Sequence, residues 1–201
     1  MLGKLKQLLG PGGEAVIIVS GLPRSGTSMM MRMLEAGGVA IMTDGERTAD
    51  EDNPKGYFEV ERVKELEKES DKSYIREGRG KALKVISFLI KDLPDDNRYR
   101  IIFMRRDLDE VLASQAKMHA RRGSEDAPDA EAIKESFRND IARVRVMARK
   151  KPHFELMEVH YKETIEDPRT VAREVNAFLG GTLDEEAMAG AVDPSLYRNR
   201  K

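Results

Sequence analysis

The stretch AVIIVSGLPRSGTS, residues 15–28, decides the fold of this 201-residue chain. Residues 15–20 form a continuous apolar run that is rich in β-branched side chains and bounded by glycines, which is typical of a parallel strand buried on both faces. After the turn, residues 27–36 carry apolar side chains at helical spacings and are followed by two glycines, as helix ends often are. The stretch therefore predicts a central strand, a glycine turn and a helix.

Strand and helix patterns alternate along the rest of the chain. Alternating strands and helices favour a parallel sheet with helices on both faces. We therefore expect an α/β fold, a three-layer sandwich with a parallel central sheet, and a loop from residue 43 to residue 56. The expected strands are 39–42, 82–86, 100–104 and 155–161, and the expected helices cover 59–69, a segment capped by Asp107, a long segment after residue 131, and a segment from Pro168 to Leu179.

Composition restricts the partners. The 35 basic and 36 acidic residues give a net charge of -1, so no global field attracts nucleic acid or an anionic membrane surface. No run approaches the roughly 18 apolar residues of a membrane span, and residues 1–10 hold too short an apolar run for a secretory signal. The chain has no cysteine, and its three histidines show no metal-ligand spacing. We expect one cytoplasmic domain that binds neither nucleic acid nor metal.

The turn GLPRSGTS, residues 21–28, has the composition of a phosphate-binding loop, because a buried strand leads through two glycines to a helix N-terminus. In the ATP-binding pattern G-x-x-x-x-G-K-[ST] a lysine follows the last glycine, but Thr27 stands there and the strong cation of the loop is Arg24. Without that lysine, and without a second acidic strand end to hold magnesium, ATP hydrolysis is disfavoured. A degenerate kinase or nucleotide hydrolase and a catalytically silent nucleotide-binding protein stay open as alternatives.

Two segments carry a family resemblance. PRSGTS, residues 23–28, resembles the 5′-phosphosulfate-binding loop of sulfotransferases, which use 3′-phosphoadenosine 5′-phosphosulfate as donor. RIIFMRRDLDEVLAS, residues 100–114, resembles the 3′-phosphate motif of that family, an arginine followed eight residues later by a serine, here Arg106 and Ser114. An arginine at a strand end and a serine two turns along the next helix are able to converge on one phosphate.

The resemblance implies transfer of a sulfuryl group from this donor to an acceptor hydroxyl or amine, without a metal. It implies a P-loop NTPase-like fold and a single sulfotransferase-like domain over residues 1–201, with residues 1–13 as a lead-in and residues 193–201 as a basic tail. The acceptor and the oligomeric state stay open. The residues implied to bind the donor are Arg24, Ser25, Gly26, Thr27, Ser28, Arg106, Ser114, Tyr161, which matches a tyrosine near the adenine, and Arg198 of the tail, with Arg200 beside it.

A general base has to accept the proton of the acceptor. In the branch that modifies phenols and steroids the base is the histidine of a K-x-H strand end, and here Lys84 matches the lysine whereas Ile86 replaces the histidine. Other branches use a carboxylate in the loop after the first helix. By that resemblance we expect Glu46 to be the base, with Asp44 as an alternative and Glu59 in reserve, and Arg24 and Lys84 to act on the transferred group.

Overall fold

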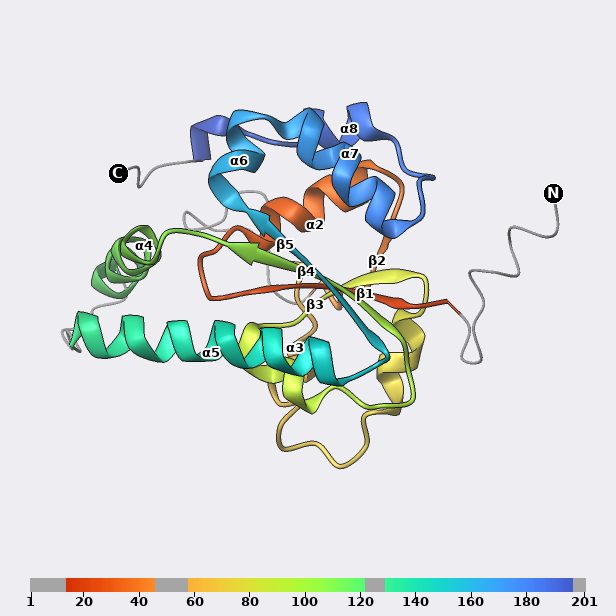
Figure 1. Cartoon of the computed structure of the whole chain (residues 1–201), viewed down its shortest axis with the longest axis horizontal. Coiled ribbons are helices and arrows are strands. Elements are labelled where there is room, and N and C mark those ends of the chain that lie inside the picture. Colours follow the sequence, from red (N-terminus) through yellow and green to blue (C-terminus); the bar gives the residue numbers. More distant parts are fainter. Residues whose placement is uncertain (1–13, 46–57, 122–128, 197–201) are drawn as a thin grey trace, which may run out of the picture.

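A computed structural model describes residues 14–45, 58–121 and 129–196, with the side chains of residues 119–121 left out (Figure 1). Five strands form one parallel sheet in the order β2-β3-β1-β4-β5. Their bounds are β1 Val16–Gly21, β2 Ala40–Ile41, β3 Lys81–Lys84, β4 Tyr99–Arg105 and β5 Phe154–His160. The predicted α/β class and parallel sheet are confirmed, and the apolar run that opens the decisive stretch is the central strand.

Helices cover both faces of the sheet (Figure 1). On one face four helices bury a methionine-rich core with Met30, Met33 and Met188 against β1 and β4. On the other face a long helix and shorter helical segments bury a second core with Ile141 and Val144. The first group is α2 Thr27–Ala36, α6 Tyr161–Glu166, α7 Pro168–Leu179 and α8 Glu185–Gly190; the second is α3 Glu61–Lys64, α5 Ala130–Lys150 and the 3-10 helices Ser73–Gly78 and Ser87–Asp92. A further helix, α4 Leu108–Arg121, follows the carboxyl end of β4, and a 3-10 helix, Pro194–Leu196, lies at the end of the described chain.

Three segments differ from the sequence prediction. The expected helix over residues 59–69 ends as α3 at Lys64, because the segment is mostly charged and buries few apolar side chains, among them Val63 and Leu66. The expected last strand stops at His160, where Thr164 Oγ1 donates a hydrogen bond to the His160 carbonyl at 2.8 Å and α6 begins. Helix α8 was not predicted, since six residues carry too little periodicity.

Topology brings the carboxyl ends of the parallel strands to one edge of the sheet. β1 is paired on one side with β3 and on the other with β4, so the segments after Gly21, Lys84 and Arg105 are neighbours. In parallel α/β sheets this edge is where ligands bind. Within the described part of the chain no helix combines the length and apolarity needed to cross a membrane.

Candidate active site

The loop between β1 and α2 forms a cradle for an anion. Gly26 has a φ of 101° and caps α2, whose first N–H groups have no partner inside the helix. Arg24 also has a positive φ, 70°, which is uncommon outside glycine. The Ser25 hydroxyl is buried and lacks a hydrogen-bond partner among the described residues. A buried polar atom of this kind, beside a helix N-terminus, fits a phosphate or sulfate ligand.

The loop and the second predicted motif are in direct contact. Arg24 Nε donates a hydrogen bond to Ser114 Oγ on α4 at 3.0 Å, across 90 positions of sequence. Arg106 NH1 donates to the Arg24 carbonyl at 3.1 Å. The predicted 5′-phosphosulfate loop and the predicted 3′-phosphate pair therefore lie against each other on the same side of the sheet.

Arg106 is enclosed by an acidic and an aromatic side chain. Its Nε lies 2.9 Å from Glu110 Oε2, and both side chains are less than a tenth exposed. Its guanidinium lies over the ring of Tyr161 at 4.5 Å from Cζ to the ring centroid. Tyr161 is buried as the first residue of α6, and this burial raises the pKa of its hydroxyl above 10.0. The structure thus places Tyr161 in contact with Arg106, the arginine of the predicted 3′-phosphate pair.

Lys84 is the third cation near the loop. It is the last residue of β3, beside Val19 of β1, and its Nζ lies 3.4 Å from Ser28 Oγ. Glu59 accepts a hydrogen bond from Lys84 Nζ at 2.9 Å through Oε1, and Glu59 Oε2 lies 3.0 Å from Lys64 Nζ. The Glu59 side chain is 14% exposed, so its carboxylate is held between two lysines at the edge of the site.

The other carboxylates of the prediction have different surroundings. Asp44 is exposed, and its Oδ2 accepts a hydrogen bond from the backbone N–H of Glu61. The Asp44 N–H donates to the Glu59 carbonyl at 3.3 Å. These contacts tie the segment after β2 to the segment before α3. Glu46, Arg198 and Arg200 lie outside the described residues. Ile86, which replaces the histidine of K-x-H, packs against the core below the sheet.

Sequence reasoning missed one side chain of the site and underrated another. Glu110 was not singled out, although a glutamate four residues after an arginine at a helix start is a recognisable pairing signal. Glu59 was only a reserve candidate, because nothing local in the sequence indicates its contact with Lys84, 25 residues away. No cluster of three or more potential metal ligands occurs within residues 14–45, 58–121 and 129–196.

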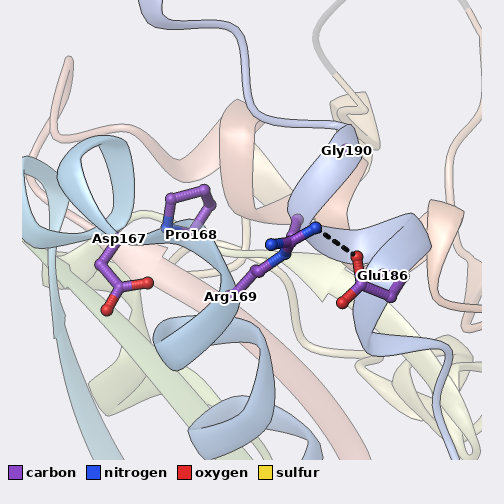
Figure 2. A pocket seen from close by; sticks show the side chains of 6 residues that line it. Asp167, Pro168, Arg169, Glu186 and Gly190 are labelled. Atoms are coloured by element: carbon purple, nitrogen blue, oxygen red, sulfur yellow. Dashed lines mark hydrogen bonds and ion pairs between the residues drawn. The ribbon is translucent and has the colours of Figure 1, made fainter.

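A separate pocket of about 380 Å³ lies at the start of α7, beside α8 (Figure 2). Its polar groups are engaged with one another or with backbone: Arg169 pairs with Glu186 at 3.1 Å, and Asp167 caps α7 by accepting a hydrogen bond from the Thr170 N–H. None of the residues that line it belongs to the predicted site. The lining residues are Asp167, Pro168, Arg169, Glu186, Ala189 and Gly190. This pocket is therefore distinct from the candidate active site.

Comparison with protein families agrees with the geometry of the loop and the arginine-serine pair. The model of the sulfotransferase domain matches residues 14–201. The chain belongs to the sulfotransferase domain family. It is accordingly an enzyme of the transferase class, and the family match supports sulfuryl transfer from 3′-phosphoadenosine 5′-phosphosulfate.

Solved sulfotransferase structures share the fold of this sulfotransferase. The sulfotransferase domain of the olefin synthase from Synechococcus PCC 7002 is 15% identical with a TM-score of 0.56, covering 96% of this chain and 90% of that chain. The sulfotransferase from Alicyclobacillus acidocaldarius is 16% identical with a TM-score of 0.50, covering 92% of this chain and 88% of that chain. Mouse sulfotransferase SULT7A1, solved in complex with PAP, is 16% identical with a TM-score of 0.50, covering 94% of this chain and 66% of that chain. Comparison with curated protein sequences gives no match.

Proposed function

We propose that this sulfotransferase binds 3′-phosphoadenosine 5′-phosphosulfate across the joined loop and arginine-serine pair, and transfers its sulfuryl group to an acceptor hydroxyl or amine. The observation that carries the proposal is the 3.0 Å hydrogen bond from Arg24 Nε to Ser114 Oγ. That bond sets the two predicted phosphate-binding elements side by side, as a nucleotide with a phosphate at both ends of its ribose requires. The PAP found in mouse SULT7A1 is the nucleotide product that this reaction would leave.

The cations in and beside the loop stabilise negative charge in this proposal. As the bond from sulfur to the acceptor oxygen or nitrogen forms and the sulfur–oxygen bond to the nucleotide phosphate breaks, negative charge moves to the phosphate. Arg24, Lys84 and the N–H groups at the start of α2 would stabilise that charge, which is the role of preorganised donors in transfer reactions. Ser25 and Ser28 would add hydroxyl donors beside them. Arg106, Ser114 and Tyr161 would hold the 3′-phosphate and the adenosine, with Arg198 as an additional ligand.

The proton of the acceptor needs a carboxylate, since Ile86 supplies no base. Of the two candidates that the structure describes, Glu59 is better supported than Asp44, because it contacts Lys84 and Lys84 in turn lies 3.4 Å from Ser28. We propose Glu59 as the base among the described residues and test Glu46 beside it. A positioned base contributes typically ~10²–10⁴-fold in rate.

Ligand-dependent stabilisation tests the donor assignment. A ligand that binds the folded protein raises its melting temperature in proportion to the logarithm of its concentration over Kd. We expect 3′-phosphoadenosine 5′-phosphate in EDTA to raise the Tm and ATP with magnesium to leave it unchanged. Stabilisation by ATP with magnesium alone would instead indicate a kinase or nucleotide hydrolase. Binding of the donor without turnover across a broad panel of alcohols, phenols and amines would indicate a silent binding protein.

A further inference from the structure

A buried carboxylate lies at the place where the proposed function puts a phosphate. Glu110 is 6% exposed and forms its ion pair with Arg106 at 2.9 Å. Burying a carboxylate is costly, and a negative charge next to an anion site weakens anion binding through Coulomb repulsion. A favourable contribution of Glu110 to the site therefore has to offset both the cost of burial and this repulsion.

The contacts of Arg106 indicate what that role is. A guanidinium is planar, so its orientation is fixed once several of its groups are held. Here Nε is held by Glu110, NH1 by the Arg24 carbonyl at 3.1 Å, and one face by the ring of Tyr161 at 4.5 Å. These three contacts come from α4, the loop and α6, and they define both the position and the plane of the guanidinium before any ligand arrives.

One of these contacts also bears on the loop. The carbonyl that Arg106 binds belongs to Arg24, whose φ of 70° is unfavourable for a residue with a side chain. A hydrogen bond to this carbonyl stabilises that backbone conformation. Arg106 therefore acts on both ends of the proposed donor, directly at the 3′-phosphate and indirectly through the loop.

The neighbouring arginine provides an internal comparison. Arg105 is the last residue of β4 and, like Arg106, pairs with a glutamate, here Glu158 of β5, which Arg145 of α5 contacts as well. That pair is about a fifth exposed and lies on the α5 side of the sheet. Two consecutive arginines are thus paired with glutamates, and of the two pairs the Arg106 pair is the more deeply buried and lies beside the phosphate loop.

From this geometry we infer that Glu110 is a positioning residue that gives this sulfotransferase its selectivity for a 3′-phosphorylated nucleotide, by fixing the plane of the Arg106 guanidinium. The inference rests on the proposed function, because it assumes that Arg106 binds the 3′-phosphate. It predicts that removing the charge of Glu110 lowers the preference for the 3′-phosphate. Coulomb repulsion alone predicts the opposite, because removing a negative charge next to an anion site would strengthen anion binding.

The experiment compares two nucleotides that differ only in that phosphate. Isothermal titration calorimetry measures the Kd of 3′-phosphoadenosine 5′-phosphate and the Kd of adenosine 5′-monophosphate. The Kd of the monophosphate divided by the Kd of the 3′-phosphorylated nucleotide is the 3′-phosphate preference. We expect Glu110→Gln to lower this ratio about tenfold, the effect of losing one charge-assisted hydrogen bond, with the Kd of the monophosphate within twofold of wild type. Glu158→Gln, the matched control at the neighbouring pair, should leave the ratio unchanged.

The possible outcomes are distinct. An unchanged or increased ratio in Glu110→Gln overturns the inference, and so does an equal loss of affinity for both nucleotides, which would indicate a structural role only. A wild-type protein without preference for the 3′-phosphate contradicts the proposed function itself. Melting temperatures of both variants identify any failure to fold, and Glu110→Asp, which keeps the charge, should retain more of the ratio than Glu110→Gln.

Discussion

A Cβ atom on Gly26 would clash with Cδ2 of Tyr161, so the aromatic ring rests directly on the backbone of the phosphate loop. The same ring lies against the guanidinium of Arg106, which precedes α4. Tyr161 occupies this position because β5 ends at His160 and Tyr161 is the first residue of α6. The phosphate loop and the start of α6 are therefore in direct contact through a glycine and a tyrosine.

Gly26→Ala tests this contact. The new methyl group meets the Tyr161 ring, and the φ of 101° at residue 26 is strained for alanine. We expect a lower Tm and no measurable binding of 3′-phosphoadenosine 5′-phosphate in a thermal-shift titration. Gly38→Ala is the control: residue 38 has a similar φ of 97° but no atom within 4 Å of its Cβ position, so it should lose stability and keep nucleotide binding. Equal binding by the two variants would contradict the role given to the contact.

Arg106→Ala tests the placement of the 3′-phosphate. Loss of a charge-assisted hydrogen bond costs about 1.5–3 kcal/mol, and we expect a corresponding rise in the Kd of 3′-phosphoadenosine 5′-phosphate measured by calorimetry. Arg105→Ala removes the adjacent arginine, which pairs with Glu158 instead, and should change the Kd little. If both variants bind the nucleotide as wild type does, the phosphate lies elsewhere.

Local signals explain which parts of the fold and site were predictable. The sequence alone indicates patterns that extend over only a few residues or along one helix. These are the apolar run before Gly21, the glycines of the turn, and the spacing of Arg106 and Ser114. The parallel sheet follows from the alternation of strands and helices. The start of α6 at Tyr161 was not predictable, because the apolar alternation of β5 continues through that residue while the Thr164 hydroxyl determines the turn.

Long-range pairs explain what the sequence did not indicate. The contact between Glu59 and Lys84 depends on how the segment between β2 and α3 returns to the end of β3, and many loop paths are compatible with the same residues. As candidate bases the sequence ranks Glu46 first, with Asp44 as the alternative and Glu59 only in reserve. In the structure the Asp44 carboxylate accepts a hydrogen bond from a backbone N–H, whereas Glu59 contacts Lys84.

Glu59→Gln tests the assignment of the base. If Glu59 accepts the acceptor's proton, kcat falls by ~10²–10⁴-fold while the Kd of the nucleotide stays near that of wild type. Steady-state turnover with any acceptor identified in the panel gives kcat, and Glu67→Gln, which breaks the surface pair with Lys91, is the control. Full turnover in Glu59→Gln together with loss of turnover in Glu46→Gln or Asp44→Asn would transfer the role to that residue.

Glu158 makes the stability of the fold depend on pH. The hydrogen bond from Arg145, followed by that from Arg105, holds the pKa of its carboxyl below the ordinary value of 4.5. Because the unfolded chain then binds the proton more readily than the folded one, the contribution of Glu158 to stability is present above about pH 4.5 and is lost as the pH falls through the lower pKa of the folded state.

Urea unfolding between pH 3 and pH 7 measures this contribution. We expect Glu158→Gln to be less stable than wild type at pH 7 and to lose less stability than wild type on acidification, so that the two curves converge at low pH. Glu174→Gln, a substitution at an exposed glutamate of α7, should follow the wild-type curve. A stabilising ion pair that depends on an ionised carboxylate must weaken when that carboxylate is protonated. Parallel stability curves for Glu158→Gln and wild type over the whole pH range would therefore mean that the ion pairs of Glu158 with Arg105 and Arg145 contribute nothing to acid sensitivity.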